Sequence, residues 1–401
     1  MNNKLKVLLI TPFYPFPEYA NGVNKINVNL LLENDIYNMD ILSLVSKDDK
    51  KFHDNENKFK NSKFYKIDFM HENKYLLLTK WLLGKLPFNL TKYEKIHQKV
   101  IDSINSLENN YDVIHISTPH LLPIIDKLST NILEKIILFP IDSFTLFTQR
   151  RMEQEKNILK KVLYQIDYNR LKKVELNIYS KLNKVYFVSD TDANFVNNFN
   201  DSLKTQYIPN GVDIDYFIRN ESIEIKSNSL IFTGNMSYAP NKDACEFLIN
   251  DILPILIKKI PDIRLYIVGI NADKEFKNVK SDNIIIKGFV EDIREYISQA
   301  SIYISPLRFG SGIKNKILEA MSMSKIVIGT DISFESIKGI DNSYIKTSID
   351  KNEFANSIIK ILKNPDYKIG ENARELILEK YSWKYIQKQY GKVYENCINN
   401  K

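Results

Sequence analysis

The residues with the clearest chemical potential lie in a glycine-rich, basic stretch, residues 305–321. An apolar segment, residues 300–304, precedes it, and a helical pattern begins near Ile313. A glycine-rich loop at a helix N-terminus offers unpaired backbone N–H groups to an anion. The charged side chains around the loop are those of Arg308, Lys314, Lys316 and Glu319. This combination favours a ligand with both phosphate and hydroxyl groups, such as a nucleotide sugar. A plain strand–loop–helix crossover with solvated basic residues is equally compatible with the stretch alone.

Three further side chains stand at the ends of apolar segments in the first half of the chain. The segments cover residues 112–117 and 136–143, and both are typical of buried strands in a parallel sheet. Doubly wound sheets bind ligands outside the carboxyl ends of their strands, where these side chains would lie. They are His115, His120 and Asp142. A histidine at a strand end is more often structural, so a site role and a structural role both stay open.

Asp190 and Asp192 form an Asp-x-Asp pair of the kind that can hold a divalent cation. The pair directly follows an apolar segment, residues 184–189, and precedes a helical pattern. Carboxylates in that position cap helices. We therefore interpret both acids as capping residues and predict no metal site.

These candidates need alternating strands and helices to position them, and the chain provides such an alternation twice. A turn-rich segment, residues 208–213, interrupts the pattern, which then begins again. We predict an α/β protein with a first domain at residues 1–208 and a second at 209–381, which carries the glycine loop. Residues 382–401 read as a helix that packs across the joint. Residues 46–66 are rich in Lys and Asn and are expected to form an exposed excursion.

Composition limits the possible partners and the compartment. The chain of 401 residues has a net charge of +7, which suits polyanionic ligands or an anionic membrane surface. No dense basic block is present, so we predict no nucleic-acid partner. The two cysteines, Cys245 and Cys397, indicate neither a disulfide framework nor a metal site, and a reducing cytoplasm is the expected compartment. No apolar stretch approaches the ~20 residues of a membrane span, so we expect a soluble or peripheral protein.

One segment, residues 75–86, combines large apolar residues with lysines and a tryptophan. Such a segment can lie on a membrane surface as an amphipathic element. A helix packed on its own domain explains the pattern equally simply, and its short length favours that interpretation. Both interpretations remain open from the sequence.

The second half of the chain resembles a known family in its motifs and in their order. The motifs are Pro209-Asn210-Gly211-Val212-Asp213, Phe232-Thr233-Gly234-Asn235, Ile267-Val268-Gly269, Gly288-Phe289-Val290, Ser305-Pro306-Leu307 and Gly310-Ser311-Gly312-Ile313-Lys314 with residues 315–321. Together they resemble the GT-B glycosyltransferases, specifically family 4, over roughly residues 205–335. The first domain is similar mainly in its opening strand, in Gly22 and in residues 112–115. Departures elsewhere resemble a branch linked to bacterial polysaccharide export.

The resemblance implies two doubly wound, Rossmann-like domains that face a central cleft. It implies a retaining transferase that uses a nucleotide-diphosphate sugar and needs no cofactor or metal. Glu319 would hold the donor ribose hydroxyls, a role that suits a carboxylate. The diphosphate leaving group would be stabilised by Arg308, Lys314, Lys316 and the amides around Gly310 and Gly312. The remaining expected donor-binding residues are Gly22, Gly234, Asn235, Lys242, Gly288, Phe289, Val290, Ser311 and Ile313.

Three departures from the family pattern affect the expected site. Ser311 stands where the family's first glutamate of a pair would stand, eight residues before Glu319. Lys242 is the only cation near the end of the second domain's first strand. The family's histidine after the fifth strand of the first domain has no match, and Asp142 is the residue expected to take that role.

The leading hypothesis is therefore a cytoplasmic enzyme, with possible contact to the inner face of the membrane. Its acceptor would be a glycan or a lipid-linked glycan of a bacterial surface polysaccharide or lipopolysaccharide, with His115 and His120 as candidates on the acceptor side. A non-catalytic partner subunit that binds a nucleotide sugar or glycan is the second hypothesis. A nucleotide-sugar epimerase is the third.

Overall fold

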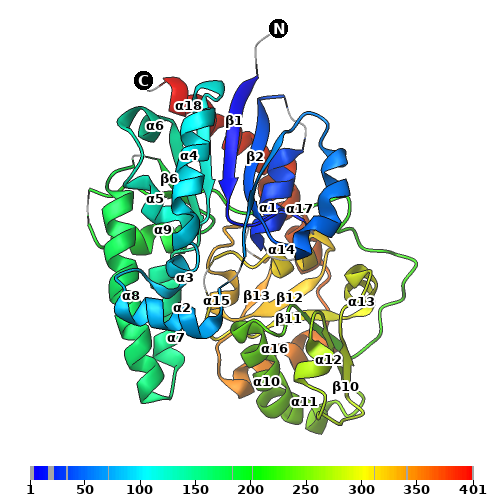
Figure 1. Cartoon of the computed structure of the whole chain (residues 1–401). Helices are drawn as coiled ribbons and strands as arrows, with labels where there is room; N and C mark the ends of the chain where they lie inside the picture. The colour runs from blue at the N-terminus through cyan, green and yellow to red at the C-terminus, as the bar shows by residue number, and fades with distance from the viewer. Residues whose placement is uncertain are drawn as a thin grey trace. The chain divides into compact units, whose positions relative to one another are not determined.

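A computed structural model describes residues 4–16, 22–32, 35–70, 72–182, 184–200, 202–310, 312–339 and 342–399. The chain divides into two compact units, each shown in Figure 1 with its own sheet and helices. The first unit contains the described residues up to Pro209 together with Ile386–Asn399, and the second contains the described part of Asn210–Tyr385. No helix in the described ranges has the length and hydropathy that crossing a bilayer requires.

The first unit is built on a parallel sheet with the strand order β3-β2-β1-β4-β5-β6-β7. Its strands are β1 Leu5–Thr11, β2 Tyr37–Val45, β3 Phe64–Asp68, β4 Val113–Ser117, β5 Ile136–Ile141, β6 Val185–Phe187 and β7 Gln206–Tyr207. Strand β1 pairs with both β2 and β4, so the direction of winding reverses between β1 and β4. The nearly continuous apolar runs in β1, β4 and β5 fit a sheet that is covered on both faces.

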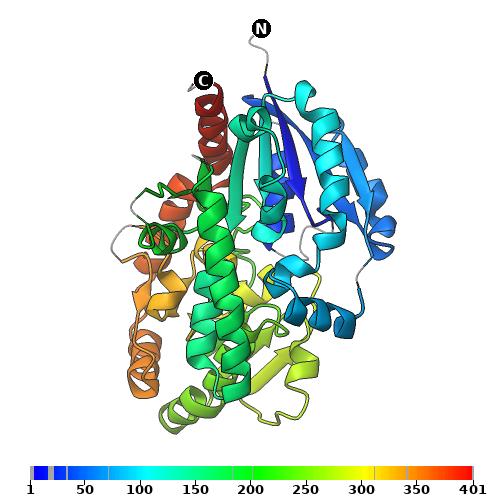
Figure 2. The same cartoon turned by 60° about the vertical axis from the view of Figure 1, so that its left-hand side comes forward.

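Helices of the first unit cover the two faces of this sheet. They are α1 Gly22–Leu31, α2 Lys74–Leu83, α3 Phe88–Thr91, α4 His97–Leu107, α5 Leu122–Ile125, α6 Thr130–Lys135, α7 Phe144–Gln154, α8 Ile158–Tyr179, α9 Asp190–Asn197 and, from Ile386 on, α18 Trp383–Asn399, with the 3-10 turns η1 Asp48–Lys58, η2 Glu94–Ile96, η3 Glu108–Asn110 and η4 Pro119–Leu121. Alternate residues of a strand point to opposite faces. Ile114 and Ile116 of β4 join the cluster formed with α4, α5 and α8. In Figure 2, α8 is the long green helix. The side chain of His115 points to the opposite face of the sheet from Ile114 and Ile116, where it meets Tyr394.

The second face of the first sheet is closed by α18, which lies far away in sequence. His115 Nδ1 is 2.8 Å from the Tyr394 hydroxyl. The rings of Phe139 and Tyr390 stack with their centroids 4.7 Å apart, and the His115 ring lies 4.2 Å from that of Phe139. These aromatic side chains are fully buried, so α18 completes the core of the first unit.

The second unit is a parallel sheet with the strand order β10-β9-β8-β11-β12-β13. Its strands are β8 Ser229–Thr233, β9 Arg264–Val268, β10 Ile284–Lys287, β11 Ile302–Ser305, β12 Ile326–Gly329 and β13 Ile345–Lys346. Its helices are α10 Ala239–Phe247, the π-turn η5 Leu248–Ile252, α11 Leu253–Lys259, α12 Ala272–Glu275, α13 Ile293–Gln299, α14 Asn315–Ser322, α15 Asp331–Phe334, α16 Lys351–Lys363 and α17 Lys368–Lys380. The winding reverses between β8 and β11. Ligands of such sheets bind at the carboxyl ends of the strands at this reversal.

The sequence-based fold class is confirmed, since both sheets are parallel and both units alternate strands with helices. Residues 46–66 were expected to form an exposed excursion. The turn η1 in this segment has no buried residue, but residues 64–66 begin β3, which pairs with β2. The strand lies at the edge of the sheet and is only partly buried, so its apolar signal is weak.

Candidate functional site

The candidate site of the second unit lies at the carboxyl ends of β8 and β11, where the winding reverses. Two glycines permit the backbones there to touch. A Cβ added to Gly269 would lie 2.1 Å from the Gly234 carbonyl oxygen, and one added to Gly234 would lie 2.7 Å from Asn241 Nδ2. Both glycines also have positive φ angles, +154° at Gly234 and +140° at Gly269. A side chain at either position would collide with these atoms, so the close packing at the ends of these strands requires glycine.

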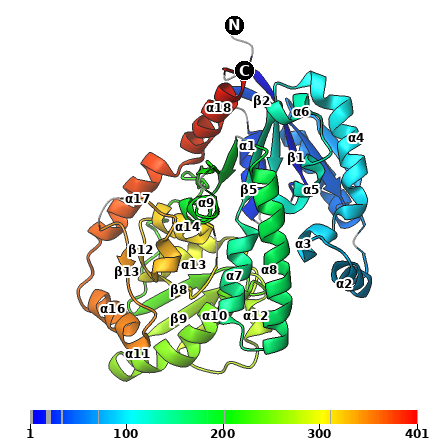
Figure 3. The same cartoon turned by 90° about the vertical axis from the view of Figure 1, so that its left-hand side faces the viewer.

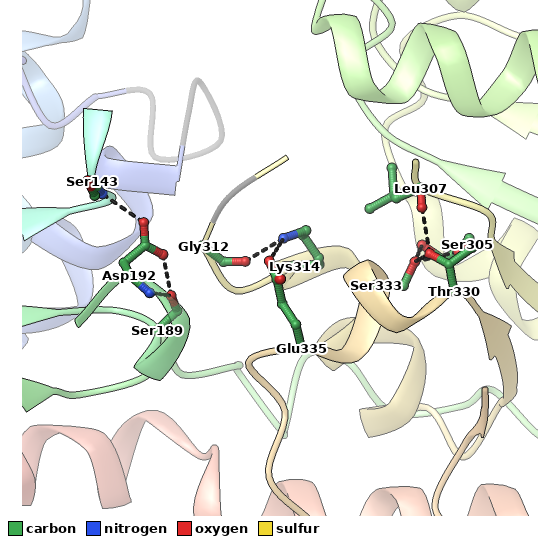
Figure 4. A network of polar contacts seen from close by, with 10 residues as sticks. All are labelled: Ser143, Ser189, Asp192, Ser305, Leu307, Gly312, Lys314, Thr330, Ser333 and Glu335. Carbon is green, nitrogen blue, oxygen red and sulfur yellow. Dashed lines mark hydrogen bonds and ion pairs between the residues drawn. The ribbon is translucent and has the colours of Figure 1, made fainter. Parts of the chain in front are cut away.

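The basic glycine loop between β11 and α14 is fixed at its base by hydroxyl groups, as Figure 4 shows. The Thr330 hydroxyl donates to the Leu307 carbonyl oxygen at 2.5 Å, and the Ser333 hydroxyl donates to the Ser305 carbonyl oxygen at 2.5 Å. The loop itself turns through Gly310 and Gly312, with φ angles of +138° and +66°. Ser311, expected to bind the donor, lies outside the described residues.

Arg308 links this loop to α10 through a bidentate ion pair. Its Nε donates to Asp243 Oδ2 at 2.8 Å, and its terminal nitrogen donates to Asp243 Oδ1 at 2.5 Å. The guanidinium also lies 5.0 Å from the centre of the Phe247 ring. A planar fork held this way has a fixed direction. The Asp243 carboxylate offsets the charge of Arg308, and the ion pair ties the loop after β11 to α10, the helix that follows β8.

Lys316, in the first turn of α14, points back across the end of β8. Its Nζ donates to Asn241 Oδ1 at 2.6 Å and lies 3.9 Å from the centre of the Phe232 ring. Burial, with a smaller effect from the charge of Lys314, lowers the pKa of Lys316 to about 7, while Cys245 and Glu319 act in the opposite direction. An anion bound beside this ammonium would favour the charged form.

Lys314 caps the same end of α14 from the other side. Its Nζ donates to the Gly312 carbonyl oxygen at 2.5 Å and lies 3.6 Å from Glu335 Oε1 (Figure 4). Glu319 follows on the second turn of α14 and is half-buried. Asn315, the first residue of the helix, accepts a 2.9 Å hydrogen bond from Asn210 Nδ2. The start of α14 thus carries two lysines and the carboxylate of Glu319 next to a glycine loop, with the Glu335 carboxylate beside Lys314.

The other expected donor-binding residues fall into different environments. The Asn235 carbonyl oxygen accepts a hydrogen bond from Asn241 Nδ2 at 2.9 Å, beside Gly234. Lys242 is drawn away into a 2.7 Å ion pair with Glu275. Gly288 lies against Asp273, whose oxygen would be 2.6 Å from an added Cβ. Phe289 is exposed, Val290 is half-buried and Ile313 is buried in the loop.

Sequence reasoning missed Asn241 and Asp243, which receive Lys316 and Arg308. Both residues belong to α10, Ala239–Phe247, directly after the motif at Gly234. The only signal was their position after that motif, because the partners lie 75 and 65 residues further along the chain.

In the first unit, two strand ends have unusual backbone angles. Thr118, after β4, has a φ of +88°, and Ile141, the last residue of β5, has a φ of +71°. Positive φ at a β-branched residue is strained and is found mainly where the surrounding structure enforces it, often near functional sites. The turn at Ile141 is closed by a 3.0 Å hydrogen bond from the Asp142 N–H to the Pro140 carbonyl oxygen. Asp142 is half-buried at this turn.

The two histidines of the first unit lie in different places. His115 is enclosed between Phe139 and α18, and burial lowers its pKa to about 3, so it is neutral and out of contact with solvent. His120 lies closer to the surface among three aromatic rings, those of Phe13, Tyr93 and Phe144, with centroids 5.0 to 5.3 Å away. Burial, and then the charge of Lys92, lowers the pKa of His120 to about 3. His120 is thus the histidine next to the strained strand ends.

Buried acids hold the residues after Asp142 in place. Glu175 of α8 accepts hydrogen bonds from the Phe144 N–H at 2.8 Å and from the Ser143 hydroxyl at 3.0 Å. Asp192 of α9 accepts from the Ser143 N–H at 2.8 Å (Figure 4). Carboxylates satisfy the free N–H groups at the start of α7 in this way. The position of Asp142 is therefore set by two helices that lie later in the sequence.

Replacing Glu175 with glutamine is expected to remove a pH dependence of folding stability. Burial raises the pKa of Glu175 from 4.5 to about 7, so the folded unit binds this proton more tightly than the unfolded chain does. The resulting stabilisation is complete below the unfolded pKa and is lost as the pH rises through the folded pKa. Urea unfolding measures the free energy of unfolding at each pH. Between roughly pH 5 and 8 this free energy should fall by about 2.5 kcal/mol more in the wild type than in Glu175→Gln. Equal changes in the two proteins would contradict the assignment.

Asp190 and Asp192 lie in the first turn of α9. Ser189 is the N-cap, and its hydroxyl accepts a 3.0 Å hydrogen bond from the Asp192 N–H. The Asp192 carboxylate in turn accepts a hydrogen bond from the Ser189 hydroxyl, and Asp192 is fully buried. The N-cap of α9 is therefore Ser189 and neither acid; Asp190 and Asp192 lie in the first turn of the helix, where the helix dipole favours negative charge. Within the described ranges, no group of three or more His, Cys, Asp or Glu residues is placed to hold a metal ion.

The amino-acid sequence is similar to those of known sugar transferases. Residues 227–364 match the family model described as glycosyl transferases group 1. A 44.6 kDa protein of the cps region of Klebsiella pneumoniae is 24% identical over 292 residues, 70% of this chain and 73% of that protein. The phosphatidyl-myo-inositol mannosyltransferase of Mycolicibacterium smegmatis is 25% identical over 199 residues, 47% of this chain and 51% of that enzyme. The chain thus spans about half the length of this mannosyltransferase.

The fold is also found among solved structures. HepE of Anabaena, solved in complex with UDP and glucose, superposes with a TM-score of 0.67 at 14% identity, covering 98% of this chain and all of that one. This likeness concerns the fold, and the structural neighbours of the chain are GT-B glycosyltransferases. Residues 227–364 are thus similar to group 1 glycosyl transferases, and the fold of the chain is shared with HepE.

Proposed function

We propose that this protein is a retaining glycosyltransferase that moves a sugar from a nucleotide-diphosphate donor to a glycan or lipid-linked acceptor. The observation that carries the proposal is the start of α14, where a glycine loop, Lys314, Lys316 and Glu319 converge at the winding reversal of the second sheet. The match of residues 227–364 to group 1 glycosyl transferases supports it. So does the complex of Anabaena HepE with UDP-glucose, a nucleotide sugar bound to a protein of the same fold.

In this proposal the donor diphosphate lies against the N-terminus of α14. Lys316, Lys314 and the loop amides bind its oxygens and stabilise the charge that develops as the sugar leaves. Glu319 accepts hydrogen bonds from the ribose hydroxyls. Gly288, Phe289 and Val290 border the base, and Gly22 of the first unit binds at the phosphates. Because protein cations and amides supply the positive charge, the reaction is proposed to need no metal or other cofactor.

We further propose that the acceptor belongs to a bacterial surface polysaccharide or lipopolysaccharide and that the protein works in the cytoplasm. The similarity to a protein of the Klebsiella cps region supports the first part. Asp142 is the proposed catalytic residue that acts on the sugar or the acceptor, and His120 is a proposed acceptor-side residue. His115, the other histidine expected there, is buried in the core of the first unit.

Incubation with a panel of UDP-, GDP- and ADP-sugars tests the proposal. Transfer or slow hydrolysis that releases free nucleotide supports it. Binding without turnover would indicate a non-catalytic partner subunit. An epimerised sugar that is still attached to its nucleotide would indicate an epimerase.

Replacing Asp142 with alanine or asparagine is expected to lower turnover by about a hundredfold while leaving donor affinity within about twofold, because Asp142 is proposed to act on the sugar or acceptor. Steady-state kinetics and calorimetry with the nucleotide sugar give the two quantities. Asp126→Ala serves as a control, since Asp126 pairs with Lys181 on the surface. An unchanged turnover number would make Asp142 a structural turn residue.

A further inference from the structure

Helix α2 buries one narrow edge and exposes the rest of its apolar side chains. Leu77 and Trp81 point inward and are 7% and 3% exposed. Tyr75, at 81%, and Leu83, at 90%, point outward. Positions 75, 78 and 82 lie three and four residues apart and share one face, and positions 76 and 83 flank it. The helix is therefore packed on its own unit and also presents a second apolar face to solvent, so both interpretations of the segment contribute.

The first turns of α8 carry a second exposed apolar stripe. Ile158 and Leu159 are each 77% exposed, and Val162, Leu163 and Ile166 continue the stripe at 36% to 53%. The spacing of four residues places 158, 162 and 166 in one row and 159 and 163 in the next. The core-facing residues of α8, such as Leu171 and Ile178, come only later in the helix. Clustered exposed apolar residues of this kind mark an interaction surface.

The two stripes lie on neighbouring helices of the same unit. Trp81 Nε1 of α2 donates to Asp167 Oδ1 of α8 at 2.8 Å, and Arg170 donates to the Trp81 carbonyl oxygen at 2.6 Å. The Arg170 guanidinium lies 5.5 Å from the centre of the Trp81 ring. Figure 3 shows α2 and α8 in this unit. Asp167 directly follows Ile166, the last residue of the α8 stripe. Its hydrogen bond with Trp81 therefore joins the end of that stripe to the buried side of α2.

We call this surface the α2–α8 face; its apolar members are Tyr75, Leu76, Leu78, Leu82, Leu83, Ile158, Leu159, Val162, Leu163 and Ile166. The charges near it are mostly positive: residues 72–85 and 150–161 contain eight Lys or Arg and three Glu. Of these Glu, Glu72 is paired with Lys80 at 2.8 Å. Exposed apolar rows beside lysines are the pattern of a surface that enters the headgroup region of a bilayer, with lysines reaching anionic phosphates.

We propose that the α2–α8 face docks the protein on an anionic lipid bilayer. The charge favours this occupant over a second copy of the chain, since two identical basic faces would repel each other. Docking would give the protein access to a lipid-linked acceptor, and this purpose rests on the proposed function. The binding itself does not depend on it.

Co-sedimentation of the full chain with vesicles tests this inference without any sugar nucleotide. Vesicles of phosphatidylcholine alone and with about 30% phosphatidylglycerol are compared at about 50 mM and 500 mM NaCl. We expect binding to the anionic vesicles that is weaker at high salt. The double variant Leu83→Glu, Leu159→Glu should reduce the partition coefficient at least about tenfold, because each leucine is replaced by a charge that the interface rejects.

Ile349→Glu is the matched control, because Ile349 is 58% exposed in the second unit and outside the face. It should bind vesicles as the wild type does. Equal binding of the wild type and the double variant overturns the inference, and so does a lack of binding to anionic vesicles. A concentration-dependent dimer in light scattering that the double variant abolishes, without vesicle binding, would assign the face to a second copy instead.

Donor binding by calorimetry separates this inference from the proposed function. The double variant should bind a nucleotide sugar as tightly as the wild type, since its substitutions are outside the α14 site. Vesicle binding without any nucleotide-sugar binding leaves the inference standing and sinks the proposed function. The reverse result sinks the inference alone.

Discussion

Affinity for a nucleotide sugar is expected to fall about tenfold for each pH unit above pH 7, because Lys316 must then take up a proton to meet the diphosphate. Burial lowers the pKa of Lys316 to about 7 in the free protein. A diphosphate next to its Nζ favours the ammonium and raises that pKa in the complex. Below pH 7 the charge is already present, and binding is strongest. Above pH 7 the free protein is increasingly neutral at this site, so binding weakens.

Calorimetry between about pH 6 and 8.5 measures this dependence, because the diphosphate of a nucleotide sugar does not titrate in that range. Lys316→Arg keeps a permanent charge and should flatten the profile. Lys316→Met should bind weakly at every pH. A flat profile for the wild type would show that Lys316 does not contact the donor.

Replacing Glu319 with alanine is expected to lower nucleotide-sugar affinity about a hundredfold, because two ribose hydroxyls lose a charged acceptor at roughly 1.5 kcal/mol each. Glu319 lies half-buried on the second turn of α14, so water replaces it only in part. Glu371→Ala serves as the control, since Glu371 is exposed on α17.

A dideoxy nucleotide sharpens this second prediction. The wild type should prefer the ribonucleotide to its 2′,3′-dideoxy analogue, and Glu319→Ala should bind both alike. If the variant keeps the full preference for the ribonucleotide, Glu319 does not bind the ribose.

Local sequence pattern was sufficient for most of the fold. The apolar segments at residues 112–117 and 300–304 correspond to β4 and β11, because buried parallel strands need apolar side chains on both faces. The glycines at 234 and 269 were identified at strand ends, and their backbone contact explains why they are glycine.

Partners in the sites could not be predicted, because they depend on contacts between distant residues. The Arg308 side chain pairs with Asp243. Lys316 donates to Asn241, whereas Lys314 donates to the Gly312 carbonyl oxygen. His115 looked like a strand-end site residue, but its burial comes from Tyr394, which is 279 residues away. Nothing in the pattern around residue 115 contains that information.

The docking of α18 has a consequence for the order in which the protein is made. The first unit is translated first, but its aromatic layer at His115 and Phe139 is closed by Tyr390 and Tyr394, which leave the ribosome after the whole second unit. Until then an apolar sheet face stays uncovered in the nascent chain. The first unit should therefore reach its native state only after synthesis of the second. A fragment that ends at Pro209 should need residues 386–399, supplied as a separate peptide or fused by a linker, to become soluble and folded.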